Sequence, residues 1–170
     1  MLPTRRLTLA AIGSAMGVLF LSTGFALQVA VSFWVFMASL CVMLSLESGY
    51  IRYGIMSHIV ITFLSLVFNG FNIVFLLPYV TFMGVCPIGN AFFEKMQLPR
   101  FLSYIIKQCW FTLSIFTTIY LGAGLFFGFS LDSLSSILFI ALLTLPTFFF
   151  YNLGMVNIRR KLRRLLQVNG

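Results

Sequence analysis

Long apolar runs separated by short polar segments divide the whole chain. The first run, residues 7–27, follows the basic pair Arg5-Arg6 and contains no charged side chain. A helix of about 20 residues, rising about 1.5 Å per residue, covers a hydrocarbon core roughly 30 Å thick. We therefore expect this run to form a transmembrane helix. The same reasoning predicts six transmembrane helices, in the ranges 7–27, 29–46, 51–68, 73–89, 104–127 and 133–153.

Proline and polar residues set the boundaries between these runs. Gln28 lies between the first two runs, so we expect a tight helical hairpin there. Proline removes an intrahelical hydrogen bond, and Pro87 is therefore expected to end the fourth helix and leave residues 90–97 at the membrane interface. Pro146 interrupts the sixth run, and a basic tail, residues 157–170, closes the chain.

The composition agrees with this pattern. Hydrophobic residues make up 61% of the chain and charged residues 8%, and the mean hydropathy is +1.06, whereas soluble domains are roughly half apolar. The expected fold is therefore an all-α integral membrane protein. The 170 residues leave no room for a soluble catalytic domain beside the helices, so we expect one transmembrane domain, residues 1–170.

All 11 Lys and Arg residues fall on one side of the membrane if the six expected helices cross it in alternating directions. They are Arg5, Arg6, Arg52, Lys95, Arg100, Lys107, Arg159, Arg160, Lys161, Arg163 and Arg164. The positive-inside rule then places both termini in the cytoplasm and the protein in the plasma membrane as a multi-pass chain. Topology thus accounts for the formal charge of +8, and we expect a lipid bilayer but no nucleic acid as a partner.

The sequence offers no pattern of catalytic or metal-ligating residues. The three acidic residues, Glu47, Glu94 and Asp132, fall at the ends of the expected helices, so no paired carboxylates lie in the membrane interior. A lone histidine such as His58 is more typical of helix packing than of a haem or metal ligand. No Walker A sequence occurs, so any ATP hydrolysis would belong to partner subunits, and we do not expect an enzyme.

Polar and aromatic residues gather at the expected outer ends of the helices. An apolar, aromatic-lined pocket with a few hydrogen-bonding groups is the usual composition of a small-ligand site. Asn and Gln are also ordinary loop residues, and the chain holds 21 Phe, so the same residues are more typical of plain loops than of a pocket. The substrate-binding candidates are Gln28, Asn69, Phe71, Asn72, Phe127 and Asp132.

The first expected helix carries two pairs of small residues at a spacing of four, Ala11 with Ala15 and Gly13 with Gly17. Small side chains let helix backbones approach closely, which is a main source of helix association in lipid. The pairs are explained either by packing against the protein's own helices or by docking of another subunit.

Two stretches carry a resemblance to a known family. Thr4-Arg5-Arg6-Leu7 leads directly into the first helix and its AxxxA pair, Ala11 and Ala15, and a Pro-Tyr to Pro-Ile stretch covers residues 76–88. With the size and the six expected helices, the whole chain resembles the substrate-binding S component of energy-coupling factor (ECF) transporters, in particular small S-component-like proteins of Firmicutes.

The resemblance implies a subunit of an ABC-type importer. Such a subunit captures a vitamin or similar micronutrient at the outer face and topples in the membrane to release it inward, driven by a transmembrane scaffold subunit and two ATPases that use ATP. It implies no cofactor in this chain, and it implies that Ala11 and Ala15 form the docking surface for the scaffold. The expected outer face carries almost no charge, which favours a largely apolar ligand.

A second class of protein remains open. A structural or interaction membrane protein resembling the MreD cell-shape family has a similar size and helix count. Such a protein needs helices that face partners but no outer pocket, so a bound small molecule separates the two hypotheses.

Overall fold

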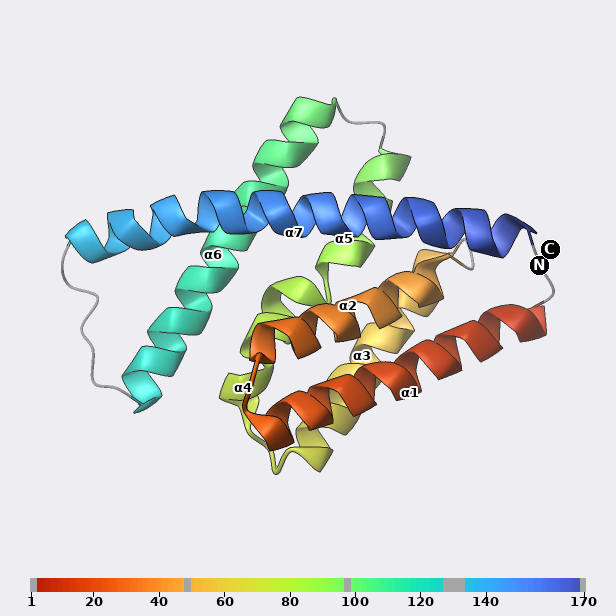
Figure 1. Cartoon of the computed structure of the whole chain (residues 1–170), viewed down its shortest axis with the longest axis horizontal. Helices are drawn as coiled ribbons and strands as arrows, with labels where there is room; N and C mark the ends of the chain where they lie inside the picture. The colour runs from red at the N-terminus through yellow and green to blue at the C-terminus, as the bar shows by residue number, and fades with distance from the viewer. Residues whose placement is uncertain (1–2, 48–49, 97–98, 127–133, 169–170) are drawn as a thin grey trace.

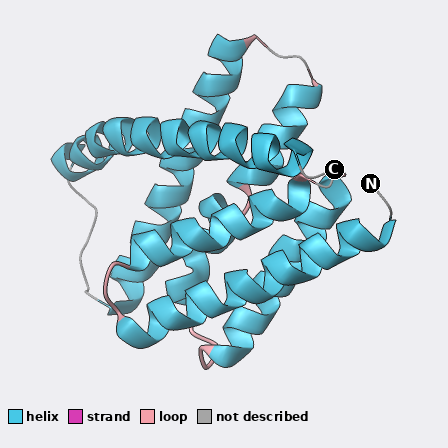
Figure 2. Cartoon of the chain, turned by 45° about the vertical axis from the view of Figure 1, so that its right-hand side comes forward, coloured by secondary structure: helices cyan, strands magenta, loops and turns pink. Residues whose placement is uncertain are grey.

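The computed structural model describes residues 3–47, 50–96, 99–126 and 134–168, which form helices and the short turns between them (Figure 2). Within these ranges no strand occurs, and the expected all-helical fold is confirmed. The elements are α1 (Pro3–Leu27), α2 (Val31–Leu46), α3 (Ile51–Phe68), α4 (Ile73–Pro78), the π-helical segment η1 (Tyr79–Met83), α5 (Cys86–Lys95), α6 (Arg100–Phe126) and α7 (Leu134–Val168).

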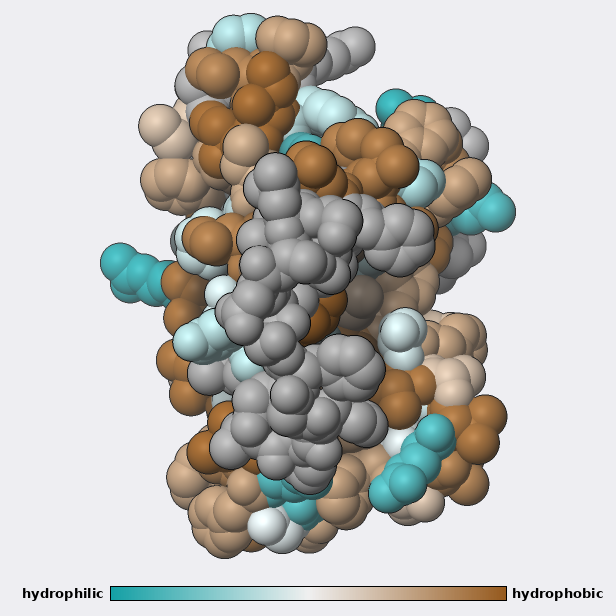
Figure 3. Space-filling view, turned by 90° about the vertical axis from the view of Figure 1, so that its left-hand side faces the viewer, coloured by the Kyte–Doolittle hydropathy of each residue, from teal (hydrophilic) through white to brown (hydrophobic). Residues whose placement is uncertain are grey.

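Three stretches are long and apolar enough to cross a membrane: Arg6–Leu27, Ile51–Phe68 and Ile73–Phe93. The shorter Val31–Leu46 is also apolar. Large apolar side chains lie on the surface, including Phe101, which is 76% exposed, and Figure 3 shows hydrophobic residues spread over one face of the molecule. A surface of this kind suits lipid, so the structure supports association with a membrane.

The fourth run does not end at Pro87, contrary to the sequence expectation. Pro87 lies in the first turn of α5, where a missing backbone N–H leaves no hydrogen bond unmade, and the helix continues to Lys95. The irregularity comes earlier, after Pro78, where the Gly84 N–H donates to the Tyr79 carbonyl at 2.7 Å, a π-helical bond. Pro146 likewise stays inside α7, which runs without a break into the basic tail.

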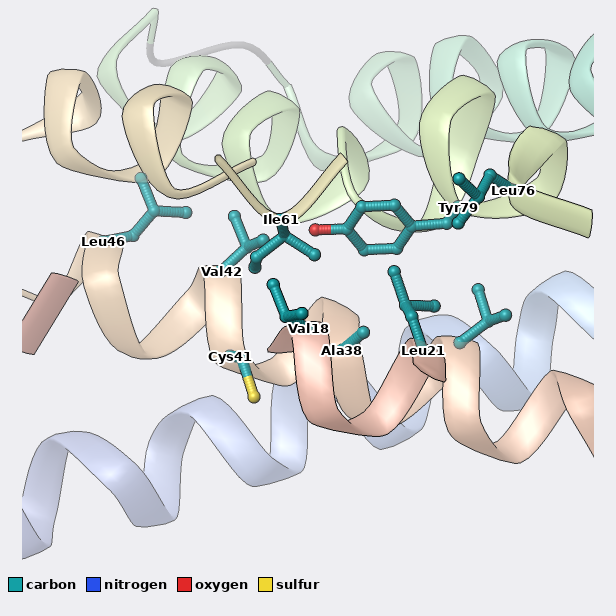
Figure 4. Packing of buried hydrophobic residues seen from close by; sticks show 10 residues of the cluster. Val18, Leu21, Ala38, Cys41, Val42, Leu46, Ile61, Leu76 and Tyr79 are labelled. Carbon is teal, nitrogen blue, oxygen red and sulfur yellow. The ribbon is translucent and has the colours of Figure 1, made fainter. Parts of the chain in front are cut away.

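Helices α1, α2 and α3 pack side by side through small residues (Figure 1). A Cβ atom on Gly13 would lie 2.8 Å from the Cys41 carbonyl oxygen, and one on Gly17 would overlap Ile61. The core that these helices share with α4 and η1 includes Val18, Leu21, Val35, Ala38, Val42, Ile61, Leu76 and the fully buried Tyr79 (Figure 4).

A second core joins α6 and α7 to the rest of the molecule, and it is built mainly from rings. The Phe82 ring centroid on η1 lies 4.5 Å from that of Phe111 on α6 and 5.2 Å from that of Tyr151 on α7. Phe111 also lies 5.4 Å from Phe148, which is fully buried. Aromatic contacts therefore fix the two C-terminal helices on η1 and on each other.

Basic side chains of α1 and α7 lie at one end of the bundle, each in contact with a residue at the connection between α2 and α3. The Arg6 guanidinium lies 4.5 Å from the Tyr50 ring centroid, and the Arg159 Nε donates to the Glu47 carboxylate at 3.1 Å. The start of α1, the connection between α2 and α3, and the last part of α7 thus share this end, which we call the basic end (Figure 1). The turns at residues 28–30 and 69–72 lie at the opposite end, which we call the loop end.

Candidate functional site

The four described ligand candidates lie on the two turns of the loop end. Gln28 and Phe71 are exposed and have left-handed backbone conformations, with φ of 52° and 61°. The Asn72 Oδ1 accepts the Phe75 N–H at 3.1 Å and so caps α4. Asn69 is buried, and its Nδ2 has no hydrogen-bond partner among the described residues. Phe127 and Asp132 lie outside the described residues.

The polar interactions of the interior concentrate on η1. Ser39 of α2 donates to the Met83 carbonyl at 2.6 Å. The Thr81 carbonyl accepts from Trp110 Nε1 at 3.1 Å and from Ser114 Oγ at 3.3 Å, both on α6. A π-helical turn after a proline departs from the i→i−4 pattern, and side chains of neighbouring helices can then bind the carbonyls. The segment that contains the Pro-Tyr stretch is therefore where the helices meet.

A cavity of about 230 Å³ lies beside this segment, between α2, α4, η1, α6 and α7. We call it the hydroxyl cavity, because five of its lining residues are Ser or Thr. Most ligand pockets have volumes of roughly 300–1,000 Å³, so this cavity is a small one. Its lining residues are Ser32, Pro78, Thr81, Phe82, Met83, Phe111, Ser114, Ile115, Thr118, Ile119 and Thr147.

The hydrogen bonds of the lining hydroxyls determine what the cavity can recognise. Thr81, Thr118 and Thr147 each donate to the carbonyl of the residue four positions earlier, at 2.7, 2.9 and 2.8 Å. Ser114 donates to the Thr81 carbonyl. Because a hydroxyl has one proton and two lone pairs, these groups retain acceptor capacity only. The cavity is suited to a largely apolar molecule that carries a hydrogen-bond donor.

Sequence reasoning did not find these residues. Ser114 and Thr118 are four apart and share a face of α6, which the sequence could have indicated. Their convergence with Thr81 and Thr147 depends on how three separate helices cross, and no local pattern encodes that. The sequence candidates were chosen for their position in loops at the expected outer face, and in the structure those residues lie on the two turns of the loop end.

His58 packs against Tyr79, with the ring centroids 5.3 Å apart. A Cβ on Gly84 would overlap His58 Nδ1, so glycine is required for this close approach. The His58 Nδ1 and the Tyr79 hydroxyl are both buried without a hydrogen-bond partner among the described residues. In the same ranges, no group of three or more His, Cys, Asp or Glu side chains is placed to hold a metal ion.

The small-residue pairs of α1 face in different directions. Gly13 and Gly17 are buried against α2 and α3, whereas Ala11 and Ala15 are exposed. Packing within the chain therefore accounts for the glycine pair. The alanine pair forms a strip of small side chains on the exposed surface of α1.

These features define an all-helical protein suited to a membrane, with a small hydroxyl-lined cavity between its helices. No protein-family model matches the chain, and no curated protein sequence and no solved structure shows significant similarity to it.

Proposed function

We propose that the protein is the substrate-binding subunit of an ECF-type importer, a multi-pass protein of the plasma membrane with six spans and both termini in the cytoplasm. The distribution of basic residues supports this topology. If the six expected helices alternate in direction, every Lys and Arg falls on one side of the membrane. Arg6 and Arg159 also meet their partners at the same end of the bundle. The basic end would face the cytoplasm and the loop end the exterior.

The hydroxyl cavity is the observation that carries the proposal. A structural protein that only joins partners has no need for a cavity lined by hydroxyl acceptors and aromatic rings. Phe82 and Phe111 supply apolar surface, and Thr118 and Thr147 supply acceptors. The substrate would be a vitamin or another small, largely apolar micronutrient with at least one N–H or O–H group.

The exposed strip at Ala11 and Ala15 would receive a transmembrane scaffold subunit, and two ATPases bound to that scaffold would hydrolyse ATP. Small side chains there permit close approach of a partner helix. The strip and the hydroxyl cavity lie on different parts of the molecule, so substrate binding and docking would be separable by mutation.

Affinity purification from the native host in mild detergent tests the proposal, with mass spectrometry of both the co-purifying proteins and the extracted small molecules. We expect a scaffold subunit, two ATPases and a stoichiometric metabolite. Recovery of cell-wall or division proteins, with neither ligand nor ATPase, would instead favour a structural protein resembling the MreD family.

Two adjacent threonines of α6 give a matched pair for the cavity. Thr118 lines the cavity, and Thr117 does not, although both hydroxyls donate to the carbonyl four residues earlier at 2.9 Å. Thr118→Leu fills the cavity and should reduce the metabolite recovered per mole of protein at least about tenfold, whereas Thr117→Leu should leave it unchanged. Thermal unfolding first shows that both variants are folded. If equal amounts of metabolite were then recovered from both, the ligand would bind elsewhere.

A further inference from the structure

One face of α3 is polar, although the helix is apolar enough to cross a membrane. Four residues three or four positions apart make up this face: His58, Thr62, Ser65 and, at the C-cap, Asn69. Residues at these spacings lie on one side of a helix, and at a rise of about 1.5 Å per residue the four cover about 16 Å. We call this line of side chains the polar face.

The polar atoms of this face are buried and have no partner in the protein. Among the described residues, no hydrogen bond is made by His58 Nδ1, Thr62 Oγ1, Ser65 Oγ or Asn69 Nδ2. Hydroxyls elsewhere in the chain donate to the carbonyl four residues earlier, as those of Ser14 and Thr81 do at 2.8 and 2.7 Å. Thr62 and Ser65 make no such bond. The helix therefore does not satisfy its own polar face, and an unsatisfied polar group is costly within a membrane.

The irregular segment after Pro78 lies against the inner end of the polar face. The ring centroids of His58 and Tyr79 are 5.3 Å apart, and Figure 4 shows the Tyr79 hydroxyl directed toward the apolar side chain of Ile61. A Cβ on Gly84 would overlap the His58 ring and lie 2.9 Å from Tyr79 Cζ. Irregular backbone at membrane depth occurs where it is buried in protein or lines a water-filled space. A π-helical turn beside unsatisfied polar atoms fits the second case.

We propose that a file of water molecules runs along the polar face, between α3 and the segment formed by α4 and η1, from the loop end to His58. The unsatisfied atoms need both kinds of partner, because Asn69 Nδ2 only donates whereas the Ser, Thr and Tyr hydroxyls donate and accept. Water supplies both and is small enough to follow one helix face. Asn69 is next to the exposed Gly70 and Phe71 of the turn, where the file meets the solvent.

This path is separate from the hydroxyl cavity. The residues that line the hydroxyl cavity come from α2, α4, η1, α6 and α7, and none belongs to α3. The path brings water to the buried His58 Nδ1 and to the Tyr79 hydroxyl, so both groups can exchange protons with the solvent at the loop end. This consequence holds whether or not the chain is a subunit of an importer.

Cysteine accessibility of the full-length protein in nanodiscs tests the path. Single cysteines are introduced into a chain that carries alanine at Cys41, Cys86 and Cys109, and they are treated with a charged, hydrophilic methanethiosulfonate. Ser65→Cys should react at least about tenfold faster than Leu64→Cys, because only the thiolate reacts and it forms in water rather than in lipid. Leu64 is 38% exposed on the surface of the bundle and Ser65 is 0% exposed, so burial alone predicts the opposite order.

Ile61→Cys separates the path from a general opening of the bundle. Ile61 is also 0% exposed, but its side chain lies against Gly17 of α1. Its thiol should react as slowly as that of Leu64→Cys. Equal rates for Ser65→Cys and Ile61→Cys, whether both are slow or both are fast, would overturn the proposal.

The unmutated protein allows a second measurement that needs no cysteine variant. Hydroxyl radicals formed from water by X-ray radiolysis oxidise the side chains beside that water. Tyr79 and Tyr151 are both buried, but the Tyr151 hydroxyl lies 3.2 Å from Ser39 Oγ and is satisfied. Mass spectrometry should show Tyr79 oxidised at least about threefold faster, because ordered water lies beside its hydroxyl. Oxidation of Tyr79 no faster than that of Tyr151 would contradict a water file that reaches η1.

Discussion

The two ends of the sequence build their helix contacts in opposite ways. Helices α1 to α3 touch through glycine, with Gly13 against the Cys41 carbonyl and Gly17 against Ile61. Helices α6 and α7 meet the rest of the molecule through rings such as Phe111 and Phe148. Close backbone contact leaves little space between α1, α2 and α3. The hydroxyl cavity lies beside these rings and is lined in part by α6.

The first prediction breaks the glycine contact, and it has the largest expected effect. Gly13→Leu places a side chain against a backbone carbonyl that cannot rotate away, 2.8 Å from the new Cβ. We expect a loss of at least about 3 kcal/mol of stability, or failure to recover folded protein. Thermal unfolding in detergent, followed by size-exclusion chromatography, measures this.

Ala11→Leu is the control on the opposite face of the same helix. Ala11 is exposed, so the added side chain should not lower the unfolding temperature. Under the proposed function it should abolish co-purification of the scaffold subunit while the metabolite is retained. An Ala11→Leu protein that still carries the scaffold would show that this face of α1 is not the docking surface.

The second prediction breaks the aromatic contact. Phe148 is fully buried, with its ring centroid 5.4 Å from that of Phe111 and 5.2 Å from that of Tyr104. Phe148→Ala should cost about 3 kcal/mol, because the contacts of a whole ring are lost and a cavity remains.

The loss should be local to the C-terminal pair. Hydrogen exchange, followed by mass spectrometry, should speed up in α6 and α7 and stay unchanged in α1 and α2. Faster exchange across all helices would mean that both regions unfold as one unit, and the contrast between them would not extend to stability.

The difference between the regions also explains what the sequence could predict. The range 51–68 expected from the sequence has the same bounds as α3, because length and mean hydropathy are local properties of the chain. Pro87 was misjudged because proline is compatible with a first helical turn, and only the start of α5 at Cys86 reveals that position. The hydroxyl cavity depends on the crossing of α6 and α7 over η1, which no single segment records.

The last prediction compares one hydroxyl pair from each region and has the smallest effect. Ser14 Oγ lies 2.9 Å from Ser57 Oγ between α1 and α3, and both residues are buried. Thr112 Oγ1 lies 3.2 Å from Thr144 Oγ1 between α6 and α7, and Thr112 is only half-buried. Hydrogen bonds between membrane helices contribute roughly 0.6 kcal/mol on average and at most about 1.7.

We expect Ser14→Ala to cost about 1 kcal/mol and Thr112→Val about half of that, measured by reversible denaturation in mixed micelles. Ser14→Ala removes the shorter, drier bond and leaves Ser57 without its partner in a tight contact. Thr112→Val keeps the side-chain volume at a contact that rings already hold. If Thr112→Val proved the costlier change, hydrogen bonding rather than ring packing would hold α7 on α6. The two regions would then differ only in that α1 to α3 touch through glycine and α6 and α7 do not.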